Sequence, residues 1–370
     1  MQSRRHNETV RSDELDYDLP EDRIATDPAE PRDSARLMIA RRHSDIVEHH
    51  TVADLPLLDG LINADDLLVL NRTQVLPARF SGHRAATGGH VEGLYLRSPE
   101  PGCWRVMLES RGHLNAGEVI RLGGVPNVDL ELVQDCGDGQ WQARLQCSLE
   151  ALEILRRIGQ PPLPPYIRRR RRSLGRPQTT REDADRYNTV FGCEPGSVAA
   201  PTAALHFTAR LLDQIEAKGV KRATLTLHIG LGTFSPVRTE RLDDHTMHAE
   251  RMTIPATTIE ALNQARHRGS RIIPVGTTCV RALESLPDSV LRGPRDFCDT
   301  TNLFIRPGSD PYAFRFADAL MTNFHLPRST LMALVAALPG VGLERLKRWY
   351  RIAIDEGYRF YSYGDAMLVL

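Results

Sequence analysis

Several short segments of this sequence carry side chains that can bind ligands or transfer protons. In one of them, residues 226–234 (TLHIGLGTF), His228 precedes Gly230 and Gly232 in an apolar run. Because glycine has no Cβ, a ligand can approach such a backbone closely. The segment lacks the third glycine of a dinucleotide-binding fingerprint, and Pro236 prevents a helix from starting at once. A ligand-binding loop and an ordinary tight turn both fit this pattern.

Residues 244–250 (DHTMHAE) place two imidazoles and two carboxylates within seven residues. Imidazole titrates near neutral pH and a carboxylate can orient it, so His245, His248 and Glu250 can form an acid–base cluster. The same groups also suit zinc or iron. A solvated polar turn is the third interpretation that the spacing allows.

Polar residues also follow the apolar run RIIPVG. Thr277, Thr278 and Arg281 come directly after it, and the free backbone N–H groups of a strand-to-helix turn attract anions. Arg281 could hold a carboxylate with both arms of its guanidinium, or these residues could simply cap a helix. Cys279 is interpreted as a small buried residue, because its surroundings show nothing that would lower a thiol pKa.

The C-terminal third contains two more polar runs. Asn323 and His325 lie in TNFHLPRST, where Ser329 can cap a following helix. Tyr363 and Asp365 lie in RFYSYGD, whose aromatic rings could stack on a base, although such rings more often belong to a core.

Several common classes of site are excluded. The GxSxG elbow, the HExxH helix and the GxxxxGK[ST] phosphate loop do not occur, which excludes the commonest hydrolase, zincin and kinase-like sites. The six cysteines are scattered singly, which argues against a zinc ribbon, an iron–sulfur cluster and a disulfide framework.

One segment is strongly basic. The sequence PPLPPYIRRRRRSLGRPQ carries five consecutive arginines, Arg168, Arg169, Arg170, Arg171 and Arg172. Lys plus Arg and Asp plus Glu are equal at 47 each, so no overall field attracts a polyanion and any nucleic-acid contact must come from a local patch. We predict an exposed loop here, because adjacent guanidinium groups cannot be buried without partners. It is either a nucleic-acid-binding patch or a solvated linker.

Folded elements must position these segments. A length of 370 residues indicates about two domains, and 41% hydrophobic with 25% charged residues is typical of globular proteins. Residues 15–79 and 160–370 alternate apolar strands with helical patterns, which predicts an α/β core with a mostly parallel sheet and a ligand site at the carboxyl ends of its strands. Residues 80–159 alternate short strands with glycine-rich turns, which predicts a smaller inserted β-barrel-like domain.

The remaining features concern the chain ends and the location of the protein. Residues 1–14 are expected to form a flexible tail. The longest apolar run, residues 331–338, is too short to span a bilayer, and the N-terminus lacks the apolar core of a secretory signal. We therefore expect a cytoplasmic protein without a membrane partner, acting as a monomer.

Together these residues resemble the S-adenosylmethionine:tRNA ribosyltransferase-isomerase family of queuosine biosynthesis. The matching stretches are residues 163–167, 195–202, 205–207, 226–238, 245–250, 275–281, 322–330 and 357–367. The resemblance implies an enzyme with S-adenosylmethionine as co-substrate, no prosthetic group and no metal. Its partner would be tRNA carrying preQ1 at the wobble position, and the arginine run 168–172 would then bind this tRNA. The ribosyl moiety would be transferred and isomerised to give epoxyqueuosine, with release of adenine and methionine.

The resemblance also implies roles for individual residues, because this reaction removes a C5′ proton, protonates adenine and deprotonates the attacking amine. The expected catalytic residues are His206, His228, His245, His248, Glu250 and His325. The expected substrate-binding residues are Gly230, Gly232, Thr233, Thr277, Thr278, Arg281, Asn323, Tyr363 and Asp365.

The sequence departs from the family pattern at three places, one of which is the longer and different stretch SDPYAFRF after Gly308. It reads Asn71-Arg72-Thr73-Gln74 where the family usually has Asn-Asp or Asn-Asn followed by Thr-Arg, and Ala204 replaces a usual glycine. These departures leave open a diverged paralogue that binds S-adenosylmethionine or RNA with an altered substrate or no turnover. A metallohydrolase built on the histidine cluster is the third hypothesis.

Overall fold

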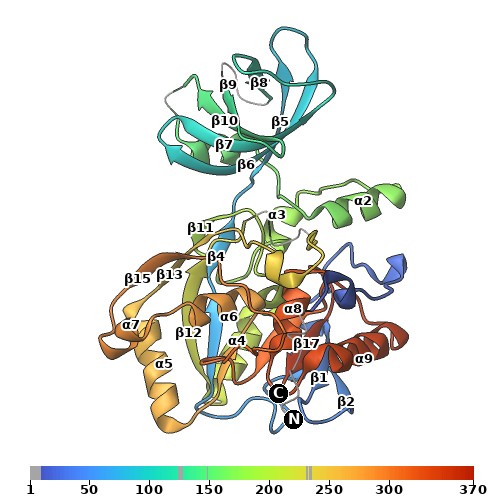
Figure 1. Cartoon of the computed structure of the whole chain (residues 1–370), viewed down its shortest axis with the longest axis vertical. Helices are drawn as coiled ribbons and strands as arrows, with labels where there is room; N and C mark the ends of the chain where they lie inside the picture. Colours follow the sequence, from blue (N-terminus) through green and yellow to red (C-terminus); the bar gives the residue numbers. More distant parts are fainter. Residues whose placement is uncertain (1–9, 124–127, 148, 231, 233–235) are drawn as a thin grey trace, which may run out of the picture.

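A computed structural model describes residues 10–123, 128–147, 149–230, 232 and 236–370. It consists of a small β-barrel joined by a narrow neck to a larger α/β body, and the C-terminus lies at the end of the body away from the barrel (Figure 1). Within the neck, Arg79 and Gln160 exchange two backbone hydrogen bonds of 3.1 and 2.8 Å. The barrel is thus inserted into the chain of the body, which confirms the predicted fold class.

The barrel is closed and its six strands are all paired in antiparallel fashion, in the order β10-β7-β6-β5-β8-β9. Alternate residues of these strands point inward, and Phe80, Trp104 and Tyr95 pack edge to face in the barrel core. Helix α1 (Ala151–Ile158) packs on the barrel through Ile154 and Leu155. The strands are β5 (Arg79–Arg84), β6 (His90–Glu100), β7 (Cys103–Ser110), β8 (Val119–Leu122), β9 (Asp129–Asp135) and β10 (Gln140–Leu145).

Mixed sheets form the centre of the body. A five-stranded sheet has the order β14-β3-β12-β13-β15, a four-stranded sheet has the order β16-β17-β1-β2, and β4 pairs with β11. The pairs β14/β3, β3/β12, β1/β17 and β4/β11 are parallel, and the other pairs of the body are antiparallel. The strands are β1 (Arg36–Ala40), β2 (Val47–Thr51), β3 (Leu67–Asn71), β4 (Thr73–Val75), β11 (Glu194–Ser197), β12 (Lys221–Leu227), β13 (Glu250–Ile254), β14 (Ile272–Pro274), β15 (Phe297–Thr301), β16 (Leu320–Asn323) and β17 (Ala366–Val369).

Helices cover these sheets, and their ends follow local sequence rules. Thr208 and Ser329 accept hydrogen bonds from the backbone N–H groups of Leu211 and Met332, both at 3.1 Å, and so cap α4 and α8. The helices of the body are α2 (Pro165–Ser173), α3 (Asp183–Arg186), α4 (Ala209–Ala217), α5 (Ala256–Arg268), α6 (Thr277–Glu284), α7 (Asp288–Arg292), α8 (Thr330–Ala337) and α9 (Gly342–Asp355). Short 3-10 helices are η1 (Ser12–Leu15), η2 (Glu21–Arg23), η3 (Arg32–Ser34), η4 (Val52–Asp54), η5 (Thr202–His206) and η7 (Leu242–Asp244). None of the helices in the described ranges is both long and apolar enough to cross a bilayer.

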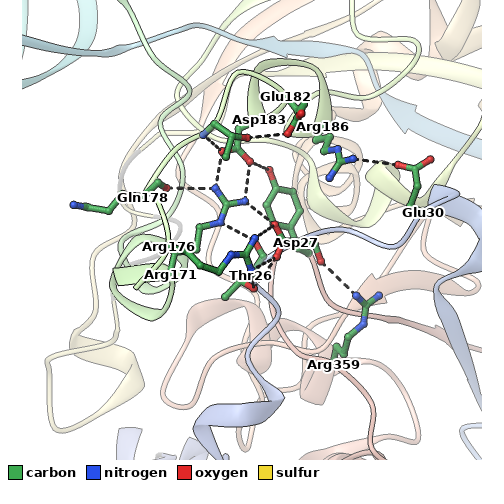
Figure 2. Close-up of polar contacts among 12 residues, drawn as sticks. Thr26, Asp27, Glu30, Arg171, Arg176, Gln178, Glu182, Asp183, Arg186 and Arg359 are labelled. Atoms are coloured by element: carbon green, nitrogen blue, oxygen red, sulfur yellow. Dashed lines mark hydrogen bonds and ion pairs between the residues drawn. The ribbon is translucent and has the colours of Figure 1, made fainter. Parts of the chain in front are cut away.

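The prediction of an exposed loop at the arginine run was wrong. Residues Pro165–Ser173 form α2, with Pro165 in its first turn, where proline is well tolerated. Arg171 is only 1% exposed, because Asp183 and Asp27 supply the carboxylates that a buried guanidinium needs (Figure 2).

The prediction of a flexible tail over residues 1–14 was wrong in the part that can be described. Residues 1–9 lie outside the described residues. After them, the backbone N–H of Ser12 donates to the carbonyl of Glu240 at 2.9 Å, and Leu15 is buried in the body. Residues 11–14 therefore belong to the folded body.

Candidate active site

A cleft of about 1430 Å³ opens between the barrel and the body. Its body wall lies at the carboxyl end of β12, where open α/β sheets commonly bind ligands. Its other wall combines aromatic and apolar side chains of the barrel with α1. The lining residues include His228, Gly230, Gly232, His245, His248 and Glu250 from the body, and Tyr95, Arg97, Trp104, Leu152 and Leu155 from the barrel and α1.

His228 directly follows β12, and its ring is held on two sides. Its Nδ1 shares a hydrogen bond of 2.9 Å with Oγ1 of the fully buried Thr73. On the other side lies Gly196, where a Cβ would come within 2.6 Å of the ring. Burial lowers the pKa of His228 below its usual value, and the positive charge of Arg251 lowers it further. The imidazole is therefore mainly neutral at pH 7 and can accept a proton.

Glu250 begins β13, is 5% exposed and is held at both carboxylate oxygens. The N–H of Gly230 donates to Oε1 at 2.8 Å, and a guanidinium nitrogen of Arg281 donates to Oε2. Donors on both oxygens fix the orientation of the carboxylate.

The strand-to-helix turn after β14 is more enclosed than its sequence suggests. Arg281 is 4% exposed and also donates to the carbonyl of Leu303 at 3.1 Å, so its guanidinium is occupied by the protein itself. Thr277 and Thr278 are buried and do not line the cleft. Here Arg281 positions Glu250, whereas we had expected it to hold a substrate carboxylate. Burial raises the pKa of the neighbouring Cys279 to about 12, in agreement with an unreactive buried thiol.

His245 and His248 complete the body wall. The ring of His248 lies directly on the backbone of Gly232. A Cβ added to Gly232 would come within 2.2 Å of Cδ2 of His248. The ring of His245 packs edge to face on Phe304 at 5.3 Å. Burial lowers the pKa of His245, and the proximity of His248 lowers it further. Gly232 thus makes room for the ring of His248, whereas a Cβ at Gly230 would make only an ordinary contact with Glu250; Thr233 lies outside the described residues.

Replacing Gly232 by alanine is expected to lower turnover at least tenfold without unfolding the protein, because the new methyl group must displace the ring of His248. Gly230→Ala is the matched control, since its Cβ would lie 3.8 Å from Oε1 of Glu250, an ordinary contact distance. Turnover of both variants is measured together with their thermal unfolding. Equal turnover for the two alanine variants would contradict the role given to His248.

A second group of expected site residues lies in the interior of the body, away from the cleft wall. Burial lowers the pKa of His206 to about 4 and that of His325 to about 3, so both imidazoles are neutral at pH 7. Nε2 of His206 lies 3.2 Å from Nδ2 of Asn323, and Nε2 of His325 shares a hydrogen bond of 2.8 Å with Thr322.

The two C-terminal candidates have partners that connect distant parts of the chain. The Asp365 carboxylate accepts hydrogen bonds from the backbone N–H groups of Arg36 and Arg359, at 3.1 and 2.8 Å. The hydroxyl of Tyr363 donates to Asp183 at 3.5 Å. These contacts hold the body together, and the structure does not bring Asn323, His206, His325, Tyr363 or Asp365 to the cleft lined by His228.

Sequence reasoning missed several residues that line the cleft or support its wall. Thr73, which is buried behind His228, was part of a departure from the family pattern, and its hydroxyl was the available clue. Gly196 and the barrel residues Tyr95 and Trp104 gave no local clue, because their partners lie far away in the sequence. Within the described part of the chain, no group of three His, Cys, Asp or Glu side chains is arranged to hold a metal ion.

Comparisons with known proteins agree with one another. A family model described as queuosine biosynthesis protein matches residues 12–369. The chain is 40% identical over 364 residues to the S-adenosylmethionine:tRNA ribosyltransferase-isomerase of Desulfitobacterium hafniense, covering 98% of this chain and 100% of that one. It is 44% identical over 361 residues to the enzyme of the same name from Rubrobacter xylanophilus, covering 98% of each. The crystal structure of S-adenosylmethionine tRNA ribosyltransferase from Thermotoga maritima is 31% identical, covers 96% of this chain and 100% of that chain, and has a TM-score of 0.52.

Proposed function

Because the chain belongs to the queuosine biosynthesis protein family, as an S-adenosylmethionine:tRNA ribosyltransferase-isomerase, we propose that its substrates are S-adenosylmethionine and tRNA carrying preQ1 at the wobble position. Its products are then epoxyqueuosine in tRNA, adenine and methionine, and S-adenosylmethionine is a co-substrate. The observation that carries this proposal is the cleft in which His228, His248 and Glu250 converge opposite a barrel wall with aromatic rings.

The cleft residues suit the proton transfers of this reaction. A sulfonium acidifies the neighbouring C5′ hydrogens, so a positioned neutral base can remove one of them. His228 suits this task because its ring is fixed by Thr73 and its pKa is lowered by burial. Departing adenine gains a proton and the preQ1 amine loses one, and the imidazoles of His245 and His248 lie in the same cleft for these transfers.

The proposal is tested by incubating preQ1-tRNA with the protein and S-adenosylmethionine and measuring the tRNA nucleosides by mass spectrometry. We expect epoxyqueuosine together with equimolar adenine and methionine, and no product from tRNA with guanine at the wobble position. Binding of both substrates without product would support the diverged paralogue. In that case Arg72, which departs from the family pattern, is the first residue to substitute. Its guanidinium lies 3.4 Å from the carboxylate of Glu194 and 3.4 Å from the hydroxyl of Thr226.

We propose that α2 contributes part of the tRNA-binding surface, with fewer arginines than its sequence suggests. Arg171 is buried and Arg170 pairs with Glu21 at 3.3 Å. Arg169 and Arg172 are exposed and form no ion pair with any residue that the structure describes. Spaced three residues apart, these two share one face of the helix with Arg168. This outward face of α2 can meet phosphates although the whole chain has no net charge.

The double variant Arg169→Gln/Arg172→Gln is expected to weaken tRNA binding. The slope of log K against log salt concentration should become shallower by about 0.7 to 0.9 for each phosphate that is no longer neutralised. S-adenosylmethionine affinity should stay the same, because neither side chain lines the cleft. Arg292→Gln/Arg295→Gln is the control, since it removes the same charge from exposed positions beside α7. Identical salt slopes for the two double variants would exclude this face of α2 from tRNA binding.

A further inference from the structure

A second hollow, of about 230 Å³, lies where the barrel meets α2, and we call it the junction groove. The barrel contributes side chains of β5 and β6, the neck contributes Gln160, and the body contributes α2 and the segment that follows it. Its polar lining residues include Arg79, Ser81, Glu92, Gln160, Arg168 and Thr179. The groove is thus lined by both the barrel and the body, beside the neck that joins them (Figure 1).

Two guanidinium groups share one carboxylate in this groove. Arg79 of β5 and Arg168 of α2 both contact Oε2 of Glu92, the latter at 3.2 Å. Burial lowers the pKa of Arg79, and the neighbouring charge of Arg168 lowers it further, so the two cations repel each other. Glu109 of β7, the cross-strand neighbour of Glu92, also attracts Arg79, and Glu92 is the carboxylate that both guanidinium groups share.

The three side chains are not equally enclosed. Those of Arg79 and Arg168 are 18% and 16% exposed, whereas that of Glu92 is 39% exposed. The cations are therefore fixed by their surroundings, and the carboxylate can turn out into water. An anion that enters the groove would meet two preoriented guanidinium forks after displacing Glu92.

We propose that the junction groove binds a backbone phosphate of tRNA between Arg79 and Arg168, with Glu92 competing for the same two side chains. Guanidinium forks match phosphate geometry, and the hydroxyl of Ser81 and the amide NH2 of Gln160 can donate beside them, whereas the Thr179 hydroxyl donates to Oε1 of Gln160 at 3.2 Å. The proposal rests on the proposed function, because it takes tRNA as the polyanion. It extends the outward face of α2 into the groove, so one stretch of RNA backbone contacts both the barrel and the body.

The test compares Glu92→Gln with Glu48→Gln. Glu48 is 44% exposed in its side chain and pairs with Arg41 at 3.0 Å on β2 of the body, so both variants remove one negative charge from an arginine-paired glutamate. Filter binding measures the dissociation constant of tRNA over a range of salt concentrations. We expect Glu92→Gln to bind tRNA several-fold more tightly than Glu48→Gln, with a salt slope steeper by up to about 0.9. Arg168→Gln should change the affinity and the slope in the opposite direction.

The outcomes separate this proposal from a purely structural role of Glu92. If Glu92 only holds the barrel to α2, Glu92→Gln binds tRNA no better than Glu48→Gln, and that result overturns the proposal. If Glu92→Gln does not fold, an unchanged slope for Arg168→Gln overturns it equally. Turnover of preQ1-tRNA is measured on the wild type in parallel. A chain that binds tRNA without turnover contradicts the proposed function but still tests the groove, and a chain that does not bind tRNA contradicts both.

Discussion

Replacing His228 by alanine is expected to lower turnover by about 10²-fold or more, the usual contribution of a general acid or base. The ring is hydrogen-bonded to the Thr73 hydroxyl and packed against the Gly196 backbone, and its pKa is lowered by burial. Adenine release in a single turnover measures the effect. Unchanged thermal unfolding and S-adenosylmethionine affinity provide the control.

The pH dependence distinguishes a base from a residue that only fills space. A base acts in its neutral form, so wild-type activity should be kept at neutral pH. It should fall on the acid side, as the pH drops through the lowered pKa of His228. The His228→Ala variant should lack this acid limb. Activity of the variant within a few-fold of wild type, or an acid limb identical to that of wild type, would reject His228 as the base.

The parts of the fold that the sequence predicted are those specified by local patterns. The barrel was recognisable because alternating residues and glycine turns repeat within each hairpin, and the capping of α8 by Ser329 depends on a neighbour three residues away. The cluster from His245 to Glu250 was recognisable for the same reason, since its chemistry is contained in a single short segment.

The parts that the sequence did not predict depend on distant partners. Nothing near Asp365 indicates that its carboxylate caps the start of β1 through the N–H of Arg36, 329 residues away. A histidine that serves the core looks the same in sequence as one that faces a substrate, which is why His206 and His325 were grouped with His228. The preference of Arg281 for Glu250 over a ligand likewise appears only when β13 and α6 are brought together.

The arginine run provides the second large effect that we expect. Replacing Arg171 by glutamine should lower the free energy of unfolding by about 3–5 kcal/mol, because it leaves a buried carboxylate without its counter-charge. Arg171 donates to both oxygens of Asp183, at 2.6 and 2.9 Å, and to Asp27 at 3.1 Å (Figure 2). Asp183 is 1% exposed, so water cannot replace the missing donors.

The adjacent Arg170 offers a control within the same helix. The side chain of its partner Glu21 is 81% exposed. Because exposed ion pairs contribute at most about 1 kcal/mol to folding stability, Arg170→Gln should change the free energy of unfolding little. Urea unfolding of both variants measures the difference. Equal stabilities would mean that Arg171 is solvated, as the bare run of five arginines suggested. A large difference means that one arginine anchors α2, the helix that carries the exposed Arg169 and Arg172, to Asp183.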